Sequence, residues 1–180
     1  ASYQNHLIKV LLANLIERGL KYDDGLLFVI DGSKGMNKAV KETFCSKSVI
    51  QRCQWHKREN VVSYLNDMDK DTYRKKMNKA YNAETYEEAL SMLKSMHYEL
   101  TMINRNAANS LLEGLEETLT LHRLQLHEVF KKSFSTTNII ENVNSQIGRY
   151  TRNVKYWKTS DQRQRWLAAG LLEAELKMNK

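Results

Sequence analysis

The sequence predicts an α/β fold that is predominantly helical, and three observations lead to this fold class. The apolar run Leu26–Ile30 ends abruptly at Asp31 and Gly32, which is typical of a strand buried on both faces and followed by a tight turn. Residues 48–54 carry a second strand pattern. Residues 58–132 show only helical periodicity, and the chain contains no proline, the residue that breaks helices.

The segment before the central strand predicts a helix and a loop. Residues 2–18 form an amphipathic pattern with Leu7 and Leu15 on its apolar stripe, and Gly19 is well placed as the C-terminal cap. Residues 21–25 are expected to be the loop. Because a helix of this kind crosses over from one parallel strand to the next, we expect a further strand before residue 1.

Asp31 is the first candidate functional residue. It stands at the carboxyl end of a central strand, where open α/β sheets gather their ligands. The alternative is that Asp31 merely caps the helix expected at residues 36–44. The stretch by itself favours neither role over the other.

Cys53 and His56 follow the second strand pattern. A Cys and a His three residues apart could bind zinc, but the chain offers no second pair at a suitable spacing. We expect His56 at the end of the second strand, beside Asp31, because successive parallel strands end at the same edge of a sheet. A purely structural histidine is the alternative.

The helical stretch at 58–132 is too long for one crossover between strands. We therefore expect an all-helical insertion in the sheet domain. The predicted organisation is a first part of the core at 1–57, the insertion at 58–133, and C-terminal core helices at 134–180.

Residues 134–158 form the second region of interest. Residues 135–138 offer four possible N-caps for a helix. Asn138 as N-cap with Glu141 three residues later is similar to a capping box, which is the structural alternative to a functional role for Glu141. A last amphipathic helix is expected at 161–178.

A basic and aromatic segment follows Glu141. Arg149, Arg152 and Lys155 are spaced three apart and are expected on one helical face, interleaved with aromatic residues that include Trp157. Basic residues beside aromatic ones suit a phosphate backbone and exposed bases.

The composition is compatible with such a partner. The net charge is +7, with basic flanks around an acidic middle at 84–117, which suggests a polyanionic partner met by the flanks, but charge alone favours the simpler alternative of a solvated basic surface. The longest apolar run has five residues, which is too short for a membrane span. Cys45 and Cys53 are the only cysteines, so no disulfide framework is expected and the cytoplasm is the expected compartment.

Three stretches together carry a resemblance to a known family. They are VIDGSKGM at 29–36, QRCQWHKRENV at 51–61 and STTNIIENVN at 135–144, with Arg149 and Arg152 behind. In this order and spacing the chain resembles the catalytic domain of the Mutator-type transposases of bacterial insertion sequences, from about residue 26 to residue 166.

The resemblance implies a ribonuclease-H-like fold with an Asp-Asp-Glu triad that holds two Mg²⁺ ions, for which Mn²⁺ can substitute. Asp31 would be the second carboxylate of the triad and Glu141 the third. Such enzymes cut the ends of the element and join the freed 3′ hydroxyl to target DNA, and His56 would contact the site. The matching signature residues are Cys53, His56, Asn138 and Asn144. The residues expected to contact DNA are Lys57, Arg58, Arg149, Arg152, Lys155 and Trp157.

The first aspartate of the triad has no counterpart in the chain and is expected before residue 1, together with the first strands of the sheet. Asp23 and Asp24 cannot replace it, because they start the strand that Asp31 ends, roughly 20–25 Å away at ~3.3 Å per residue. The chain is therefore expected to be a fragment or a remnant that is inactive alone. The full-length protein is expected to be a nucleoid-associated homodimer acting on double-stranded DNA. The alternatives are a non-catalytic nucleic-acid-binding remnant and a helical interaction protein.

Overall fold

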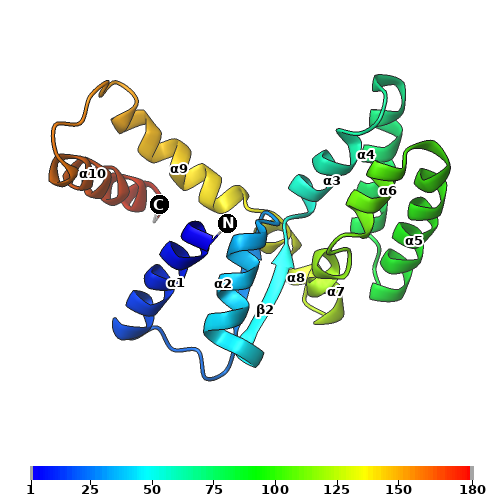
Figure 1. Ribbon diagram of the computed structural model, residues 1–180, viewed down its shortest axis with the longest axis horizontal. Coiled ribbons are helices and arrows are strands. Elements are labelled where there is room, and N and C mark those ends of the chain that lie inside the picture. Colours follow the sequence, from blue (N-terminus) through cyan, green and yellow to red (C-terminus); the bar gives the residue numbers. More distant parts are fainter. Residues whose placement is uncertain (1, 179–180) are drawn as a thin grey trace. The chain divides into compact units, whose positions relative to one another are not determined.

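The computed structural model describes residues 2–178 of the chain (Figure 1). It divides into two compact units, of which the first ends at Thr136 and the second begins at Thr137. Each unit has its own packing and is described by itself.

The first unit contains the sheet. Strands β1 (Leu26–Ile30) and β2 (Ser48–Arg52) pair in parallel, with Leu26 opposite Ser48 and Ile30 opposite Arg52. Helix α2 (Lys34–Phe44) and the 3-10 turn η1 (Cys45–Lys47) connect the two strands, as a parallel crossover requires. Within residues 2–178 the sheet has only these two strands. The α/β fold class is confirmed, and the chain is predominantly helical.

Helices α1 (Ser2–Glu17) and α2 pack together and supply the apolar cover of the sheet. The core of this part is a cluster of buried apolar side chains from both helices and both strands: Leu12, Ile30, Ala39, Val40, Phe44 and Ile50. The expectation of a β1 buried on both faces was wrong. Only Ile30 of this strand is buried and the other four residues are half-buried, because the described elements cover the small sheet incompletely.

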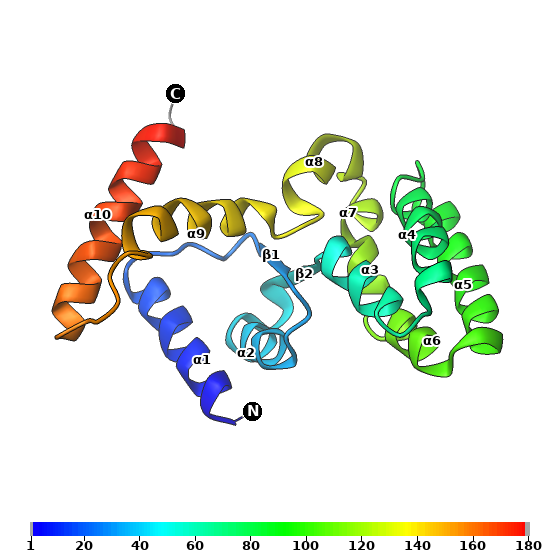
Figure 2. The ribbon, with the colours of Figure 1, turned by 90° about the horizontal axis from the view of Figure 1, so that it is seen from above.

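The rest of the first unit is helical, as the periodicity predicted. Figure 2 shows the helices of its cyan-green and green segment gathered beside one another, away from α1. These helices share their own core, which runs from Val61 to Leu119 and is separate from the core under the sheet. The elements are α3 (Gln54–Val62), α4 (Asp67–Tyr81), α5 (Tyr86–Ile103), α6 (Arg105–Leu112), η2 (Glu116–Leu119), α7 (Thr120–Arg123) and α8 (His127–Phe134). The domain boundaries expected at residues 57 and 133 remain predictions.

Short polar side chains fix where these helices begin. Thr85 accepts a hydrogen bond from the backbone N–H of Glu88 at 3.2 Å, and Asn104 accepts from Asn106 and Ala107 at 2.9 and 3.1 Å. Such N-caps satisfy donors that the first turn of a helix leaves without partners.

The second unit is a pair of helices, α9 (Asn138–Thr151) and α10 (Ser160–Met178). Gly170 of α10 allows close packing, because a Cβ at this position would lie 3.4 Å from Cγ2 of Ile147. Lys177 of α10 also donates a hydrogen bond to the Tyr150 hydroxyl of α9 at 2.9 Å.

Several predicted boundaries shift by a few residues. The second strand ends at Arg52 and not at residue 54, since α3 already begins at Gln54. Helix α2 begins at Lys34, two residues earlier than expected, because Ser33 caps it. No helix in the described part of the chain is both long and apolar enough to cross a membrane.

Candidate functional site

Asp31 leaves β1 at the carboxyl end of the parallel pair, as predicted, and its side chain is exposed. Its Oδ1 accepts a hydrogen bond from the backbone N–H of Ser33 at 3.0 Å, which closes the turn after the strand. The cap of α2 is Ser33 itself, whose hydroxyl accepts from the N–H of Met36 at 3.3 Å. The capping alternative for Asp31 is therefore wrong.

Cys53 joins the end of β1 to the start of α3. Its backbone N–H donates to the carbonyl of Ile30 at 2.7 Å, which extends the ladder by one step beyond β2. The expected position of His56 at the end of the second strand is wrong, because His56 lies in the first turn of α3. Its Nδ1 lies 3.1 Å from Sγ of Cys53, which is buried. The two signature residues thus contact one another directly.

The guanidinium of Arg52 is a part of this region that the sequence did not reveal. Arg52 ends β2, is buried, and donates from Nη1 to the carbonyl of Glu113 at 3.0 Å. It fills the space over two glycines with positive φ, Gly32 and Gly114, where a Cβ would come within 2.5 and 2.4 Å of it. Arg52 therefore connects the turn after β1 to the residues that end α6.

Lys57 does not reach the surface, so its predicted contact with DNA is wrong. Its ammonium group donates to the carbonyl oxygens of Ser110 and Glu113, and the side chain is buried. Burial, with a smaller contribution from the Arg52 charge, lowers the pKa of Lys57 to about 8. Arg52 of β2 and Lys57 of α3 thus both donate hydrogen bonds to the backbone carbonyl of Glu113.

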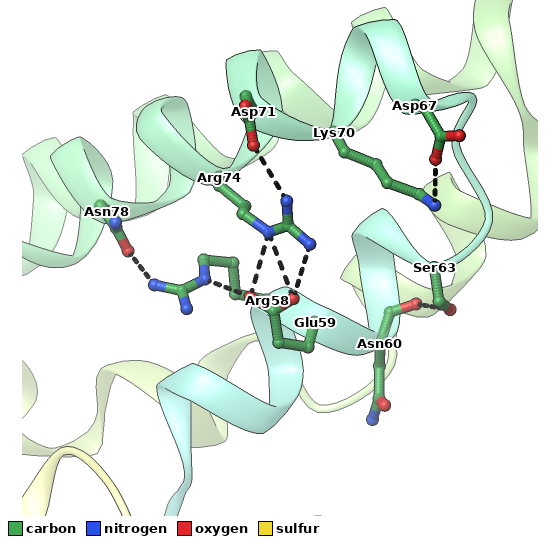
Figure 3. A network of polar contacts seen from close by, with 9 residues as sticks. All are labelled: Arg58, Glu59, Asn60, Ser63, Asp67, Lys70, Asp71, Arg74 and Asn78. Atoms are coloured by element: carbon green, nitrogen blue, oxygen red, sulfur yellow. Dashed lines mark hydrogen bonds and ion pairs between the residues drawn. The ribbon is translucent and has the colours of Figure 1, made fainter.

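Arg58 is half-buried and belongs to a polar network between α3 and α4 (Figure 3). It donates from Nε to Glu59 at 2.9 Å and from Nη1 to Asn78 at 2.7 Å. Glu59 also accepts from Arg74 of α4, which in turn reaches Asp71. Burial acts to raise the pKa of Glu59, but the two guanidinium groups hold it below its usual value. Much of the Arg58 charge is therefore compensated inside the protein.

Glu141 lies in the first turn of α9, and its side chain is exposed. Its Oε1 accepts a hydrogen bond from the hydroxyl of Thr137 at 2.8 Å. Thr137 is also the N-cap of the helix, and it is one of the four predicted candidates, so only the assignment of the cap to Asn138 was wrong. Asn138 and Asn144 are exposed on the same helix.

The three basic residues after Glu141 do not share one helical face, because α9 ends at Thr151. Arg149 lies in its last turn, Arg152 is the C-cap, and Lys155 stands in the loop that follows. All three side chains are exposed. Trp157 is half-buried and packs edge-on against Trp166, with 6.4 Å between the ring centroids.

Comparisons with known proteins agree with this picture. The sequence model described as "Transposase, Mutator family" matches residues 4–178, and the chain therefore belongs to the Mutator family of transposases. The chain is also similar to the transposase for insertion sequence element IS905 of Lactococcus lactis subsp. lactis (strain IL1403), with 26% identity over 141 residues. That match covers 78% of this chain and 35% of the relative, so the chain spans only part of the relative's length.

Proposed function

We propose that this chain is part of a transposase catalytic domain with a ribonuclease-H-like fold, in which Asp31 and Glu141 are two of the three carboxylates of an Asp-Asp-Glu site. The observation that carries the proposal is the position of Asp31, exposed at the carboxyl end of a parallel strand pair in a chain of the Mutator family. Ligands of open α/β sheets gather at this edge.

The residues fit a divalent metal ion such as Mg²⁺ or Mn²⁺. Asp31 and Glu141 offer carboxylate oxygens, the hard ligands that Mg²⁺ prefers, and both side chains are exposed. Within residues 2–178 no group of three or more His, Cys, Asp and Glu side chains could hold a metal. The first aspartate of the triad, which would supply a third carboxylate, is proposed to lie before residue 1.

The proposed reaction is phosphoryl transfer to water and then to a DNA 3′ hydroxyl. In the first step a water oxygen forms a bond to phosphorus and the bond to the 3′ oxygen breaks, which frees a 3′ hydroxyl. In the second, that hydroxyl attacks a phosphorus of target DNA and displaces the 3′ oxygen of the target strand. Two divalent ions, when bound, would activate the attacking oxygen and stabilise the leaving one.

The other residues of the chain would hold the DNA. Arg149, Arg152 and Lys155 are exposed cations that can pair with backbone phosphates, and Trp157 lies with Lys155 in the loop after α9. His56 is proposed to act beside the carboxylates, held by Cys53. The full-length protein is proposed to work as a homodimer on paired element ends.

Calorimetric titration of Mn²⁺ into the 180-residue chain tests the proposal in the presence of a short DNA duplex. Asp31→Asn and Glu141→Gln should each weaken metal binding by about tenfold or more, since even the loss of an outer-shell partner costs 10–100-fold. The matched controls are Asp23→Asn, at the other end of the strand region, and Glu173→Gln on α10, both exposed. DNA binding without metal binding that depends on these carboxylates would instead indicate a remnant that only holds nucleic acid.

A further inference from the structure

A pocket of about 360 Å³ opens in the first unit between α3, α4 and α8. Its volume lies within the range of small-molecule sites, about 300–1,000 Å³. Among the described residues that line it, none carries a carboxylate. The side chains that matter most come from three helices or their ends: Trp55, Arg58, Asn78, Asn82, Lys131 and Lys132.

The charge of the pocket is positive. Lys131 and Lys132 lie together on α8, and Arg58 adds a guanidinium that is partly compensated by Glu59. His127 also lines the pocket, but its burial lowers its pKa, which disfavours a further positive charge there. A cationic pocket without carboxylates favours an anionic ligand.

The pocket also has an aromatic side chain that is held in place. Trp55 is 45% exposed, so a large part of its ring is open to solvent. Its ring meets that of His56 edge to face, with 4.8 Å between the centroids and an angle of 87°. His56 in turn contacts the buried Cys53. His56, which is itself in contact with Cys53, therefore packs against the Trp55 ring.

We propose that this pocket binds one nucleotide of an unpaired DNA strand. The base would stack on Trp55, the amides of Asn78 and Asn82 would meet its polar edge, and Lys131 and Lys132 would pair with the flanking phosphates. The combination of an aromatic surface with cations fits a single strand, because the bases of a duplex already stack on one another. This inference rests on the proposed function only in taking DNA as the ligand.

Fluorescence anisotropy with a labelled oligo-dT 15-mer, and with a duplex of equal length, tests the proposal on the 180-residue chain. Trp55→Ala should weaken single-strand binding about 5- to 150-fold, since stacking of one base contributes about 1–3 kcal/mol. Trp55→Phe should retain most of the affinity, and duplex binding should change less than about twofold in both variants. The matched control is Tyr98→Ala, which removes an aromatic side chain that is 74% exposed on α5.

The lysines provide a second and independent readout. Lys131→Gln with Lys132→Gln should reduce the slope of log affinity against log salt for the single strand by about 1.4, or about 0.7 for each phosphate contact. Lys75→Gln with Lys94→Gln, two exposed lysines of α4 and α5, should leave that slope unchanged.

Two outcomes would overturn the inference. One is a Trp55→Ala variant that binds the single strand as well as Tyr98→Ala does, and the other is an equal loss of single-strand and duplex binding. If the wild-type chain still binds duplex DNA and shows carboxylate-dependent Mn²⁺ binding, only this inference fails. A wild-type chain that binds neither form of DNA would contradict the proposed function as well.

Discussion

The guanidinium of Arg52 lies so close over Gly32 that a Cβ on this glycine would stand 2.5 Å from Nε of the arginine. Gly32 follows Asp31 directly, and its φ of +96° is one that side chains disfavour. Arg52 thus closes over the turn that presents the candidate catalytic carboxylate. The same guanidinium binds the carbonyl of Glu113, so the helical part of the first unit helps to fix that turn.

Gly32→Ala is therefore expected to destabilise the protein more than an ordinary glycine substitution. Gly19→Ala is the matched control, because Gly19 has nearly the same φ, +97°, and nothing within 4 Å of the added methyl group. Both variants carry the backbone strain, of about 1–3 kcal/mol, but only Gly32→Ala also meets Arg52, which should cost about 1–3 kcal/mol more. Urea unfolding of the two variants measures the difference. Equal losses would show that Arg52 moves aside freely.

The buried ammonium of Lys57 should make stability depend on pH in the alkaline range. Its pKa is about 8 in the folded protein, whereas a free lysine has a pKa of about 10.4. Between these values the unfolded chain binds more protons, so the free energy of unfolding should rise with pH, by up to about 3 kcal/mol. This gain in the free energy of unfolding is complete above the pKa of the unfolded chain, and it is lost as the pH falls to 8.

Urea unfolding of wild type and Lys57→Met between pH 7.5 and 10.5 isolates this effect, since the other titrating groups are common to both proteins. The variant should lack the rise, and it should lose stability at pH 10 because the carbonyls of Ser110 and Glu113 lose a donor. Parallel curves for the two proteins would contradict the buried ammonium group.

What the sequence predicted well was local. The run Leu26–Ile30 followed by Asp31 and Gly32 identified β1 and the carboxylate at its end, and the pattern at 48–54 identified the second strand, because each strand pattern depends on neighbouring residues. The roles of Arg52 and Lys57 could not be found in this way. Their partners are the backbone carbonyls of Ser110 and Glu113, more than fifty residues along the chain. Since every residue has a backbone carbonyl, the sequence does not indicate which one a side chain will contact.

The prediction that the basic residues after Glu141 share one helical face was wrong for a different reason. Residues spaced three apart, such as Arg149, Arg152 and Lys155, share one face only as long as the helix continues. Helix α9 ends at Thr151, although no proline follows it. The chain turns there so that α10 can pack on Ile147 and Tyr150 through Gly170. Tertiary packing therefore decides where this helix ends, and the periodicity of the segment does not reveal it.

The stacked pair of His122 and His127 should make the first unit sensitive to acid. The ring centroids are 3.6 Å apart, and Nε2 of His122 lies 3.1 Å from the carbonyl oxygen of Ala83. Burial, followed by the charge of a protonated His127, lowers the pKa of His122 to about 4. Lys131 acts in the same direction on both rings, and Glu128 opposes it at His127.

Because the unfolded chain takes up a proton near pH 6.5 and the folded protein does not, stability should fall as the pH drops from about 6.5 to 4. His122→Phe keeps an aromatic ring in the stack and should flatten this part of the curve, as measured by urea unfolding. His6→Phe, at an exposed position of α1, is the control and should follow the wild type. A wild-type profile that stays flat in this range would show that the pair accepts a proton in the folded state.

The exposed cations after Glu141 should set the salt dependence of duplex binding. Each phosphate contact adds about 0.9 to the slope of log affinity against log salt for B-DNA. Arg149→Gln and Arg152→Gln should therefore each reduce the slope by about 0.9 and weaken binding to unrelated duplexes alike, because phosphate contacts carry no sequence information. Lys155→Gln should act in the same way, although it lies outside the helix.

Arg18→Gln removes an equally exposed arginine that follows α1 and serves as the control for the change in net charge. Its slope should stay at the wild-type value. If Arg18→Gln reduced the slope as much as Arg149→Gln did, duplex binding would follow the net charge of +7 alone. In that case the segment around α9 would have no preferred contact with the phosphate backbone.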